Sequence, residues 1–325
     1  MTAPSPEDVS AHRTAALRAL VDNIEQVVTG KRRVVELVVV AVGAGGHVLL
    51  EDVPGVGKTV LARALARSID GRFARVQGAP DLLPADVTGS SVYDQHEERF
   101  RFVPGPIFAN VVLVDELNRT TPRSQAALLE AMEEGQVSVD GTSHPLPVPN
   151  VVIATQNPLE HIGTFPLPES QLDRFSIATS VGYPSRTDEV TVVRAQVHTH
   201  PLERLQPVLT TDQVAWLVRA VRAVHVSDEA VDYAVRVVEA TRDHDLVELG
   251  ASPRATVQLV HAAQSLAALR GRDHVLPDDV KELAPAVLPH RLVLHRGAGA
   301  EHTDRRALVQ DLVRSVAVGG VGASS

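Results

Sequence analysis

The chain has 325 residues and a formal net charge of −9, with 44% hydrophobic and 22% charged residues. These values are typical of a globular protein with room for about two domains. The chain contains no cysteine, which excludes disulfides and thiolate metal sites. The negative charge and the aromatic content of 3% argue against nucleic acid as a partner, because strand binding needs basic grooves and stacking rings.

The first residues are polar and lack the apolar segment of a signal peptide. No uncharged apolar stretch approaches the ~18 residues that a membrane span needs. We therefore expect a cytoplasmic protein without a membrane span. Residues 1–8 are expected to form a disordered tail.

Apolar residues at helical spacing predict a helix over residues 9–28 and a second, more apolar helix over 34–42. Residues 47–50 predict a short buried strand, and residues 60–68 predict one face of a helix. The segment between them is rich in glycine and ends in Gly-Lys-Thr. Strand, loop and helix together match the context of a phosphate-binding loop.

The loop chemistry follows from its residue types. Gly55 and Gly57 let backbone N–H groups turn toward phosphate oxygens, and the helix N-terminus adds positive potential. Lys58 is predicted to reach the β- and γ-phosphates, and the Thr59 hydroxyl to ligate Mg²⁺. The predicted nucleotide-binding residues are Pro54, Gly55, Val56, Gly57, Lys58, Thr59 and Val60.

Asp52 stands where the motif G-x-x-x-x-G-K-[ST] has its first glycine. Aspartate tolerates unusual backbone angles better than most residues, so the loop can keep its shape. The geometry at the loop entry is left open. The alternative is a glycine-rich turn that caps a helix and binds no nucleotide.

A strand over 73–77, a loop or helical turn over 81–86 and a hairpin near 87–103 are predicted next. Residues 111–114 then form an apolar run, typical of a strand buried on both faces of a parallel sheet. The run leads directly into two carboxylates, at the strand end where α/β sheets bind ligands. Asp115 is expected to hold Mg²⁺ and Glu116 to polarise the attacking water, with a solvated acidic pair as the alternative.

Thr121 and Pro122 predict the start of a helix, which is followed by a second hairpin near 137–148. Residues 151–156 predict another buried strand that ends at Asn157. Asn157 either orients the same water or is an ordinary turn residue. A short helix over 167–175 and a strand over 176–181 follow. Alternating strands and helices predict an α/β domain with a parallel sheet.

From Pro184 onward the pattern is helical. Asp212, Ser227 and Ser252 are predicted to cap three helices, and two more are expected over 278–288 and 303–316. A smaller all-helical domain is the result. The histidines His198, His200, His290 and His295 are expected to be solvated and not to bind metal.

The order of these motifs resembles AAA+ ATPases, and several phrases resemble the MoxR family in particular. The phrases are Gly46-His47-Val48-Leu49-Leu50-Glu51, Asp115-Glu116-Leu117-Asn118-Arg119, Ala127-Leu128-Leu129-Glu130-Ala131-Met132-Glu133-Glu134, Ala154-Thr155-Gln156-Asn157-Pro158 and Leu167-Pro168-Glu169-Ser170-Gln171-Leu172-Asp173-Arg174-Phe175. The resemblance runs from about residue 10 to about residue 317.

The resemblance, taken with the pattern above, implies an α/β P-loop AAA+ core with a parallel sheet and a C-terminal all-helical lid domain. The expected core spans 9–183, with hairpin insertions near 87–103 and 137–148, the lid spans 184–317, and 318–325 is a disordered tail.

The resemblance also implies roles for single residues. Asn157 matches the sensor 1 residue, Arg174 the arginine finger that reaches a neighbouring subunit's γ-phosphate, and Arg254 the sensor 2 arginine. A surface pair with Asp173 is the alternative for Arg174. A basic residue in the first turn of a helix opposes the helix dipole, which favours a ligand role for Arg254, in its own subunit or a neighbour's.

Two further arginines, Arg119 and Arg123, either line a subunit interface or are solvated helix charges. Both follow the carboxylates closely in sequence, which is the only reason to single them out.

As a function, the resemblance implies Mg²⁺-dependent ATP hydrolysis by a homo-oligomeric ring, expected to be a hexamer. It further implies chaperone-like remodelling or maturation of protein complexes, including metal-cofactor insertion, with a von Willebrand factor A domain partner. Two rival functions stay open, which are a nucleic-acid motor and a nucleotide-gated scaffold without useful turnover.

Overall fold

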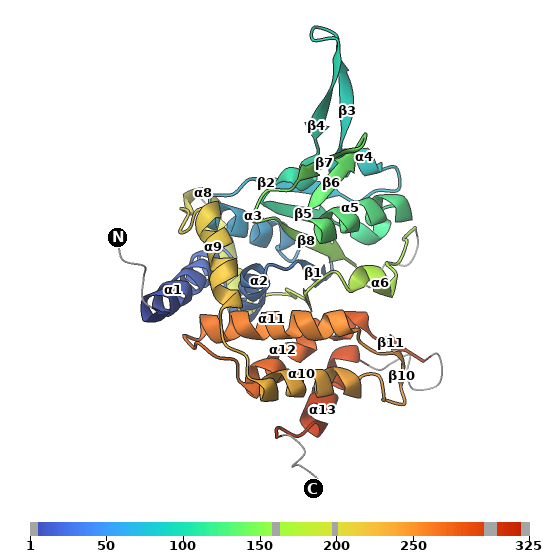
Figure 1. Ribbon diagram of the computed structural model, residues 1–325. Helices are drawn as coiled ribbons and strands as arrows, with labels where there is room; N and C mark the ends of the chain where they lie inside the picture. The colour runs from blue at the N-terminus through green and yellow to red at the C-terminus, as the bar shows by residue number, and fades with distance from the viewer. Residues whose placement is uncertain (1–5, 158–162, 197–200, 296–303, 320–325) are drawn as a thin grey trace.

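The computed structural model describes residues 6–157, 163–196, 201–295 and 304–319 (Figure 1). Its helices are α1 (Pro6–Glu25), α2 (Arg32–Gly43), α3 (Lys58–Ser68), α4 (Pro84–Thr88), α5 (Pro122–Glu134), α6 (Glu169–Leu172), α7 (Arg186–Gln196), α8 (Pro201–Arg204), α9 (Thr211–Arg222), α10 (Asp228–Ala240), α11 (Pro253–Leu269), α12 (Pro277–Val287) and α13 (Arg305–Ser315). Short 3-10 turns are η1 (Pro106–Phe108), η2 (Leu117–Arg119) and η3 (Pro289–Arg291).

The strands are β1 (Val48–Glu51), β2 (Phe73–Gln77), β3 (Gly89–Asp94), β4 (Arg99–Pro104), β5 (Val111–Asp115), β6 (Gln136–Val139), β7 (Thr142–Pro145), β8 (Val151–Gln156), β9 (Ile177–Thr179), β10 (Val247–Leu249) and β11 (Val293–Leu294). Five of them form one sheet in the order β2-β5-β8-β1-β9, and every neighbouring pair is parallel. The carboxyl ends of all five strands therefore meet at one edge of the sheet, and their amino ends meet at the opposite edge.

Apolar side chains cover both faces of this sheet, as the continuous apolar runs in its strands predict. Side chains alternate between the faces along each strand. Val48 and Leu50 of β1 join a core cluster that also holds buried residues of α1, α2 and α3. Leu49 points the other way, into a second cluster with Leu128 and Leu129 of α5.

The first cluster continues without a break into the lid helices α9 to α12. Leu217, Val238 and Leu266 of the lid belong to the same buried set as the sheet residue Ile153. Core and lid therefore share one hydrophobic interior, even though the lid leaves the sheet through a single segment after β9. The prediction of a parallel α/β core with a C-terminal helical lid is confirmed.

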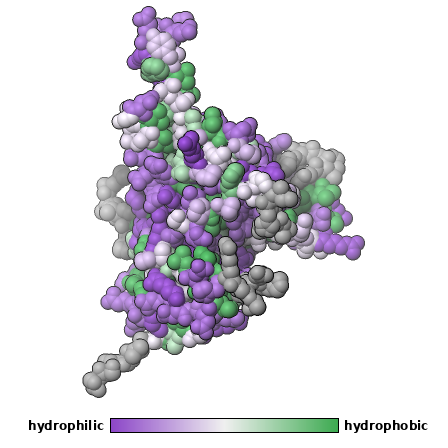
Figure 2. Space-filling model, turned by 90° about the vertical axis from the view of Figure 1, so that its right-hand side faces the viewer, coloured by the Kyte–Doolittle hydropathy of each residue, from purple (hydrophilic) through white to green (hydrophobic). Residues whose placement is uncertain are grey.

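Two antiparallel hairpins extend from the core, formed by β3–β4 and by β6–β7. The first projects far from the rest of the molecule (Figure 1) and carries hydrophobic patches along its length (Figure 2). Tyr93 and Phe100 face each other across the strands, with ring centroids 5.4 Å apart, and Phe100 is 72% exposed. The hairpins predicted near 87–103 and 137–148 coincide with these strands.

Several local expectations are wrong. Helix α1 begins at Pro6, inside the predicted tail of residues 1–8, because Pro6, Glu7 and Asp8 suit the first turn of a helix. Helix α9 is capped by Thr210, whose hydroxyl accepts the N–H of Gln213, and not by Asp212. Most of the predicted tail 318–325 and the histidines His198 and His200 lie outside the described residues.

The lid also contains a short antiparallel pair, β10 with β11, which the expectation of an all-helical domain lacked. Strands of three and two residues are too short to leave an alternating pattern in the sequence. His290 is buried and not solvated, because its Nε2 lies 2.9 Å from the carbonyl oxygen of Phe175. Within the described ranges, no helix has both the length and the apolarity needed to cross a membrane.

Candidate nucleotide site at the carboxyl edge of the sheet

The loop between β1 and α3 has a backbone that requires glycine at two positions. Gly55 and Gly57 have φ angles of +85° and +94°, in the left-handed region that side chains disfavour. A Cβ atom at either position would meet no other atom within 4 Å. The positive φ angles, and not a lack of space for a side chain, therefore require glycine at these positions. This is expected for a loop that turns its N–H groups toward a phosphate.

Lys58 is the first residue of α3, and its ammonium lies at the mouth of this loop. It donates to the carbonyl oxygens of Asp52 and Val53, at 3.1 and 3.2 Å. The charge is held by neutral oxygens and not by a carboxylate. An anionic phosphate is a stronger acceptor than either carbonyl, so the lysine is placed to exchange these partners for a ligand.

Asp52 resolves the open question about the loop entry. Among the described residues of the loop, positive φ angles fall on Gly55 and Gly57 and not on Asp52, so this position does not require glycine. The Asp52 side chain is 6% exposed and accepts the backbone N–H groups of Val181 and Gly182. Asp52 thus joins the loop to the chain segment that follows β9.

Asp115 is the last residue of strand β5 and Glu116 follows it, next to the phosphate loop. The hydroxyl of Thr155 donates to Asp115 Oδ1 at 2.7 Å and accepts the N–H of Glu116 at 2.9 Å. One side chain from β8 therefore fixes both carboxylate-bearing residues. Glu116 has a φ angle of +55°, a rare conformation for a residue with a side chain, and such strain occurs most often at functional sites.

Strand β2 contributes two polar side chains that sequence reasoning missed. Arg75 Nη2 lies 2.7 Å from Asp115 Oδ2, and Gln77 Nε2 donates to Glu116 Oε2 at 2.9 Å. In the sheet register, Gln77 stands beside Asp115, so both contacts follow from strand pairing. For Gln77, the signal available in the sequence was a polar residue at the carboxyl end of a neighbouring strand, which also applies to Thr155, whereas Arg75 lies in the middle of β2.

These residues enclose a pocket of about 380 Å³. Its lining residues are Pro54, Gly55, Gly57, Lys58, Thr59, Arg75, Gln77, Asp115, Glu116, Thr155 and Asn157. Val56 and Val60 were also predicted to bind nucleotide; their side chains pack against the hydrophobic core cluster, and binding through their backbone N–H groups stays a prediction.

The pocket has the oxygen chemistry that Mg²⁺ prefers. The Thr59 hydroxyl and the Asp115 carboxylate line the same space, and Mg²⁺ binds through one or two protein oxygens plus phosphate and water. In the described part of the chain, no group of three or more His, Cys, Asp or Glu side chains could form a separate metal cage. The residues present therefore fit a magnesium ion delivered with a nucleotide.

Arg174 and Arg254 are absent from the described lining of this pocket and lie at the opposite edge of the sheet. Arg174 comes three residues before β9 begins, and its Nη1 lies 2.5 Å from Glu133 Oε2 and 2.7 Å from the carbonyl oxygen of Leu129. Arg254 Nη1 lies 2.7 Å from Glu133 Oε1. One carboxylate at the end of α5 thus holds both predicted catalytic arginines.

His47 marks this edge, because it directly precedes β1. Its Nδ1 accepts the N–H of Val152, and its Nε2 lies 3.3 Å from the carbonyl oxygen of Met132, next to Glu133. Burial, followed by the charge of Arg254, lowers the pKa of His47 to about 4, against a backbone hydrogen bond that raises it. Residues 47 and 52 bracket β1, so the arginines lie roughly 15 Å from the phosphate loop along the strand direction.

The suggested surface pair between Asp173 and Arg174 is wrong. Asp173 instead accepts from Arg291 Nη1 at 2.9 Å and from the Ser252 hydroxyl at 2.8 Å, both in the lid. Arg291 is buried, and desolvation lowers its pKa to about 10 although Asp173 opposes the shift. The segment that carries Arg174 is therefore tied to the lid.

Of the two remaining arginines, Arg119 lies 3.4 Å from Glu116 Oε2, at the rim of the nucleotide pocket. Arg123 is exposed in the first turn of α5.

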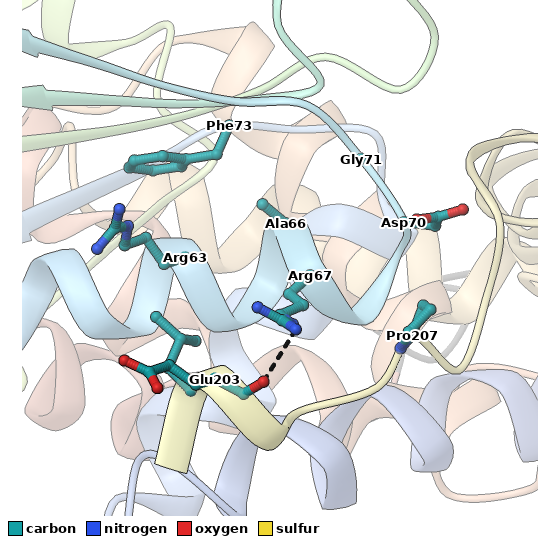
Figure 3. Close-up of a pocket in the computed structure, with 9 residues that line it drawn as sticks. Arg63, Ala66, Arg67, Asp70, Gly71, Phe73, Glu203 and Pro207 are labelled. Carbon is teal, nitrogen blue, oxygen red and sulfur yellow. Dashed lines mark hydrogen bonds between the residues drawn. The ribbon is translucent and has the colours of Figure 1, made fainter. Parts of the chain in front are cut away.

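A larger hollow of about 730 Å³ lies on another side of α3 and contains none of the predicted site residues (Figure 3). Its cationic groups already have partners. Arg67 donates to the carbonyl oxygens of Leu205 and Glu203, at 2.6 and 3.0 Å, and Arg63 stacks over the ring of Phe73 at 5.7 Å. The Arg67 contacts attach α8 and the residue that follows it to the core.

Fold and site together define a P-loop nucleotide-binding protein with a helical lid. A model of the ATPase family associated with various cellular activities (AAA) matches residues 47–177, and an AAA lid domain model matches 239–312.

Similar proteins narrow the class further. The chain is 50% identical to the uncharacterized protein YeaC of Bacillus subtilis, over 92% of this chain and 93% of that protein. It is 40% identical to the chaperone MoxR1 of Mycobacterium tuberculosis, over 98% of this chain and 87% of that protein. A crystal structure of an ATPase candidate from Cytophaga hutchinsonii has a TM-score of 0.89 and 34% identity, with 97% and 98% of the two chains covered. The chain belongs to the MoxR family of AAA+ ATPases.

Proposed function

We propose that this protein hydrolyses ATP with Mg²⁺ in the pocket at the carboxyl edge of the sheet. The observation that carries the proposal is the convergence of Lys58 and Thr59 at the start of α3 with Asp115 and Glu116 at the end of β5 on one pocket. Bound Mg²⁺ would supply charge neutralisation of the phosphates. Thr59 and Asp115 would hold it, Lys58 would bind the β- and γ-phosphates, and Glu116 would orient and polarise the attacking water.

Glu116 is prepared for this task by its surroundings. Its backbone is held by Thr155, and its carboxylate receives a hydrogen bond from Gln77 on β2. An oriented carboxylate within reach of the γ-phosphate can accept the proton of the attacking water. Asn157 at the end of β8 lines the same pocket and would assist in positioning that water.

We further propose that Arg174 and Arg254 act on the nucleotide of a neighbouring copy. Both lie at the amino edge of the sheet, whereas the nucleotide pocket lies at the carboxyl edge. A head-to-tail contact would bring the amino edge of one copy to the carboxyl edge of the next, and such contacts close into rings. A hexamer is the ring size that the family resemblance favours. The cis alternative for Arg254 has no support in this geometry.

The relatives support a chaperone-like role. MoxR1 of Mycobacterium tuberculosis is named a chaperone, and this chain aligns with nearly its full length. We propose that hydrolysis moves the lid and the projecting β3–β4 hairpin against a protein client in the cytoplasm. A von Willebrand factor A domain protein as partner, and metal-cofactor insertion as the task, rest on the family resemblance alone.

The test is phosphate release from MgATP by the purified protein, measured beside Glu116→Gln. We expect turnover by the wild type, a specific rate that rises with protein concentration, and a background rate for Glu116→Gln at unchanged ATP affinity. A wild type that binds ATP but releases phosphate no faster than Glu116→Gln contradicts the enzymatic function and favours a nucleotide-gated scaffold.

A further inference from the structure

Asp52 lies where three chain segments meet at the carboxyl edge of the sheet. Its N–H donates to the carbonyl oxygen of Gln156, at the end of β8, at 3.1 Å. Its own carbonyl oxygen accepts from the Lys58 ammonium at 3.1 Å. Its carboxylate accepts the N–H groups of Val181 and Gly182. All of the hydrogen-bonding groups of this residue therefore connect different parts of the site.

The segment held by the Asp52 carboxylate is the exit from the sheet to the lid. Residues 181–183 follow β9 and precede α7 by only a few residues. The Lys31 ammonium donates to the carbonyl oxygen of Tyr183 at 2.7 Å, so the exit is held from the turn before α2 as well. Gly182 has a φ angle of +63°, which makes the exit a tight turn.

The carboxylate at this position is costly to lose. It is buried, and it is the acceptor for the backbone N–H groups of Val181 and Gly182. Buried donors without a partner are unfavourable. Yet the backbone angles at Asp52 do not need this residue type, and a glycine would serve the loop alone. The carboxylate therefore serves the connection to the lid exit.

Lys58 links this connection to the ligand. Its ammonium has three N–H donors, and two of them are bound to the carbonyl oxygens of Asp52 and Val53. A phosphate that attracts these donors weakens a hydrogen bond to the same residue whose side chain holds Val181 and Gly182. A ligand that binds more tightly to one of two conformations of a segment shifts the equilibrium between these conformations.

We propose that Asp52 is a positioning residue that transmits nucleotide binding in the phosphate loop to the lid exit at residues 181–183. The inference rests on the proposed function, because it requires that the loop binds a nucleotide. It adds a route from the phosphate loop to the lid that stays within one copy and does not pass through a neighbouring one.

The experiment measures the core-to-lid distance with a pair of spin labels. The chain has no cysteine, so Glu130→Cys on α5 and Glu229→Cys on α10, both exposed, take the labels uniquely. The labelled protein is compared without ligand and with saturating Mg²⁺ and the non-hydrolysable analogue AMP-PNP. Asp52→Asn and Asp52→Gly are then tested in the same labelled background.

In Asp52→Asn, the amide keeps the size of the side chain but opposes one N–H donor with another donor. Asp52→Gly restores the residue type of the general motif and removes the side chain altogether. Glu51→Gln is the matched control, because Glu51 is the neighbouring carboxylate and bonds the Gln156 side chain at 2.7 Å without touching the lid exit.

We expect AMP-PNP to shift the distance distribution of the wild type and of Glu51→Gln, and the shift to be lost in both Asp52 variants although they still bind AMP-PNP. In phosphate release, we expect kcat of the Asp52 variants to fall roughly tenfold with KM within about threefold. An unchanged shift in Asp52→Asn or Asp52→Gly overturns the inference, and so does a wild type that binds AMP-PNP without any shift. Failure of the wild type to bind AMP-PNP contradicts the proposed function itself.

Discussion

The two edges of the central sheet carry different halves of the candidate catalytic set. At the carboxyl edge, Lys58, Asp115 and Glu116 share one pocket with the oxygens that Mg²⁺ needs. At the amino edge, Arg174 and Arg254 are bound to a single carboxylate, Glu133. The residues proposed to bind nucleotide and to activate water thus lie together, while the two arginines proposed to stabilise the transition state lie at the other edge.

Under the proposed function, one copy brings together the groups that bind ATP but does not bring its own Arg174 and Arg254 to them. A parallel sheet places strand ends on one side only, so a single copy cannot bring its amino edge to its own pocket. The account therefore predicts separate effects on binding and on turnover when the two edges are altered.

The largest expected effect comes from substitutions that remove one charge at each edge. Lys58→Ala should abolish MgATP binding, because the phosphate loop loses its only lysine ligand. Arg174→Ala should lower kcat by ~10³-fold, the scale of a lost arginine finger, with the Kd for MgATP within about threefold. Equilibrium binding of a fluorescent ATP analogue and phosphate release measure the two quantities. A large loss of MgATP binding in Arg174→Ala would show that Arg174 takes part in binding and would contradict the separation of the two edges.

Arg254 is expected to matter less, since it is more exposed and shares Glu133 with Arg174. We predict that Arg254→Ala lowers kcat by roughly 10- to 100-fold and leaves binding intact. Arg314→Ala is the matched control, because Arg314 is also an ion-paired arginine, is 76% exposed and lies on α13, away from both edges. Equal activities for the two variants would rule out a catalytic role for Arg254.

Thr155 sharpens the comparison at the carboxyl edge. Thr155→Val keeps the shape of the side chain but removes the donor to Asp115 and the acceptor for the Glu116 N–H. We expect kcat to fall roughly tenfold and the Mg²⁺ concentration for half-maximal activity to rise. Thr155→Ser retains the hydroxyl and should recover most of the rate. If both variants behave alike, the effect comes from packing in β8.

The amino edge should also differ in its response to pH. The folded pKa of His47 is about 4, below the ordinary value near 6.5, so the unfolded chain binds the proton more readily between these values. The contribution of His47 to the free energy of unfolding is fully present above pH ~6.5. It decreases as the pH is lowered toward about 4, because protonation of Nδ1 removes the acceptor for the N–H of Val152. The loss at pH 5 is up to about 2 kcal/mol.

Urea unfolding between pH 7.5 and 5 measures this loss. His290 is buried with a lowered pKa as well, so the wild-type curve contains contributions from more than one histidine. His47→Gln keeps an acceptor and a donor without a titrating ring, and its difference from the wild type isolates the contribution of His47. If the free energies of unfolding of the two proteins change equally with pH, His47 makes no contribution to the pH dependence.

The sequence was sufficient for the carboxyl edge because its signals are local. The loop that ends in Gly57-Lys58-Thr59 and the strand that ends in Asp115 and Glu116 each form a continuous pattern, and parallel strands necessarily bring such ends together. The helix starts at Thr121, Ser227 and Ser252 were predictable for the same reason, since a capping side chain bonds within its own turn.

The remaining features depend on which segments become neighbours. Arg75 and Gln77 reach the carboxylates only through the register of β2 with β5. Asp52 looked like a defect in the loop, and its carboxylate has partners about 130 residues away. Glu133 lies in one of the phrases that resemble the MoxR family, but nothing in that phrase predicts a role for its side chain, and only the fold brings it to both arginines. The buried position of His290 also follows from docking of the lid and leaves no local trace.

The most direct test of divided catalysis mixes two inactive variants. Glu116→Gln keeps both arginines but lacks the carboxylate proposed to activate water. Arg174→Ala keeps an intact pocket but lacks the arginine proposed to act on the neighbouring copy. The two proteins are co-assembled at equal concentration, and phosphate release from MgATP is compared with that of each variant alone. If the arginine acts on a neighbour, roughly a quarter of the contacts in a random ring combine an intact pocket with an intact arginine, and turnover returns to about that fraction of the wild-type rate. A mixture that stays at the sum of the two background rates would contradict the account.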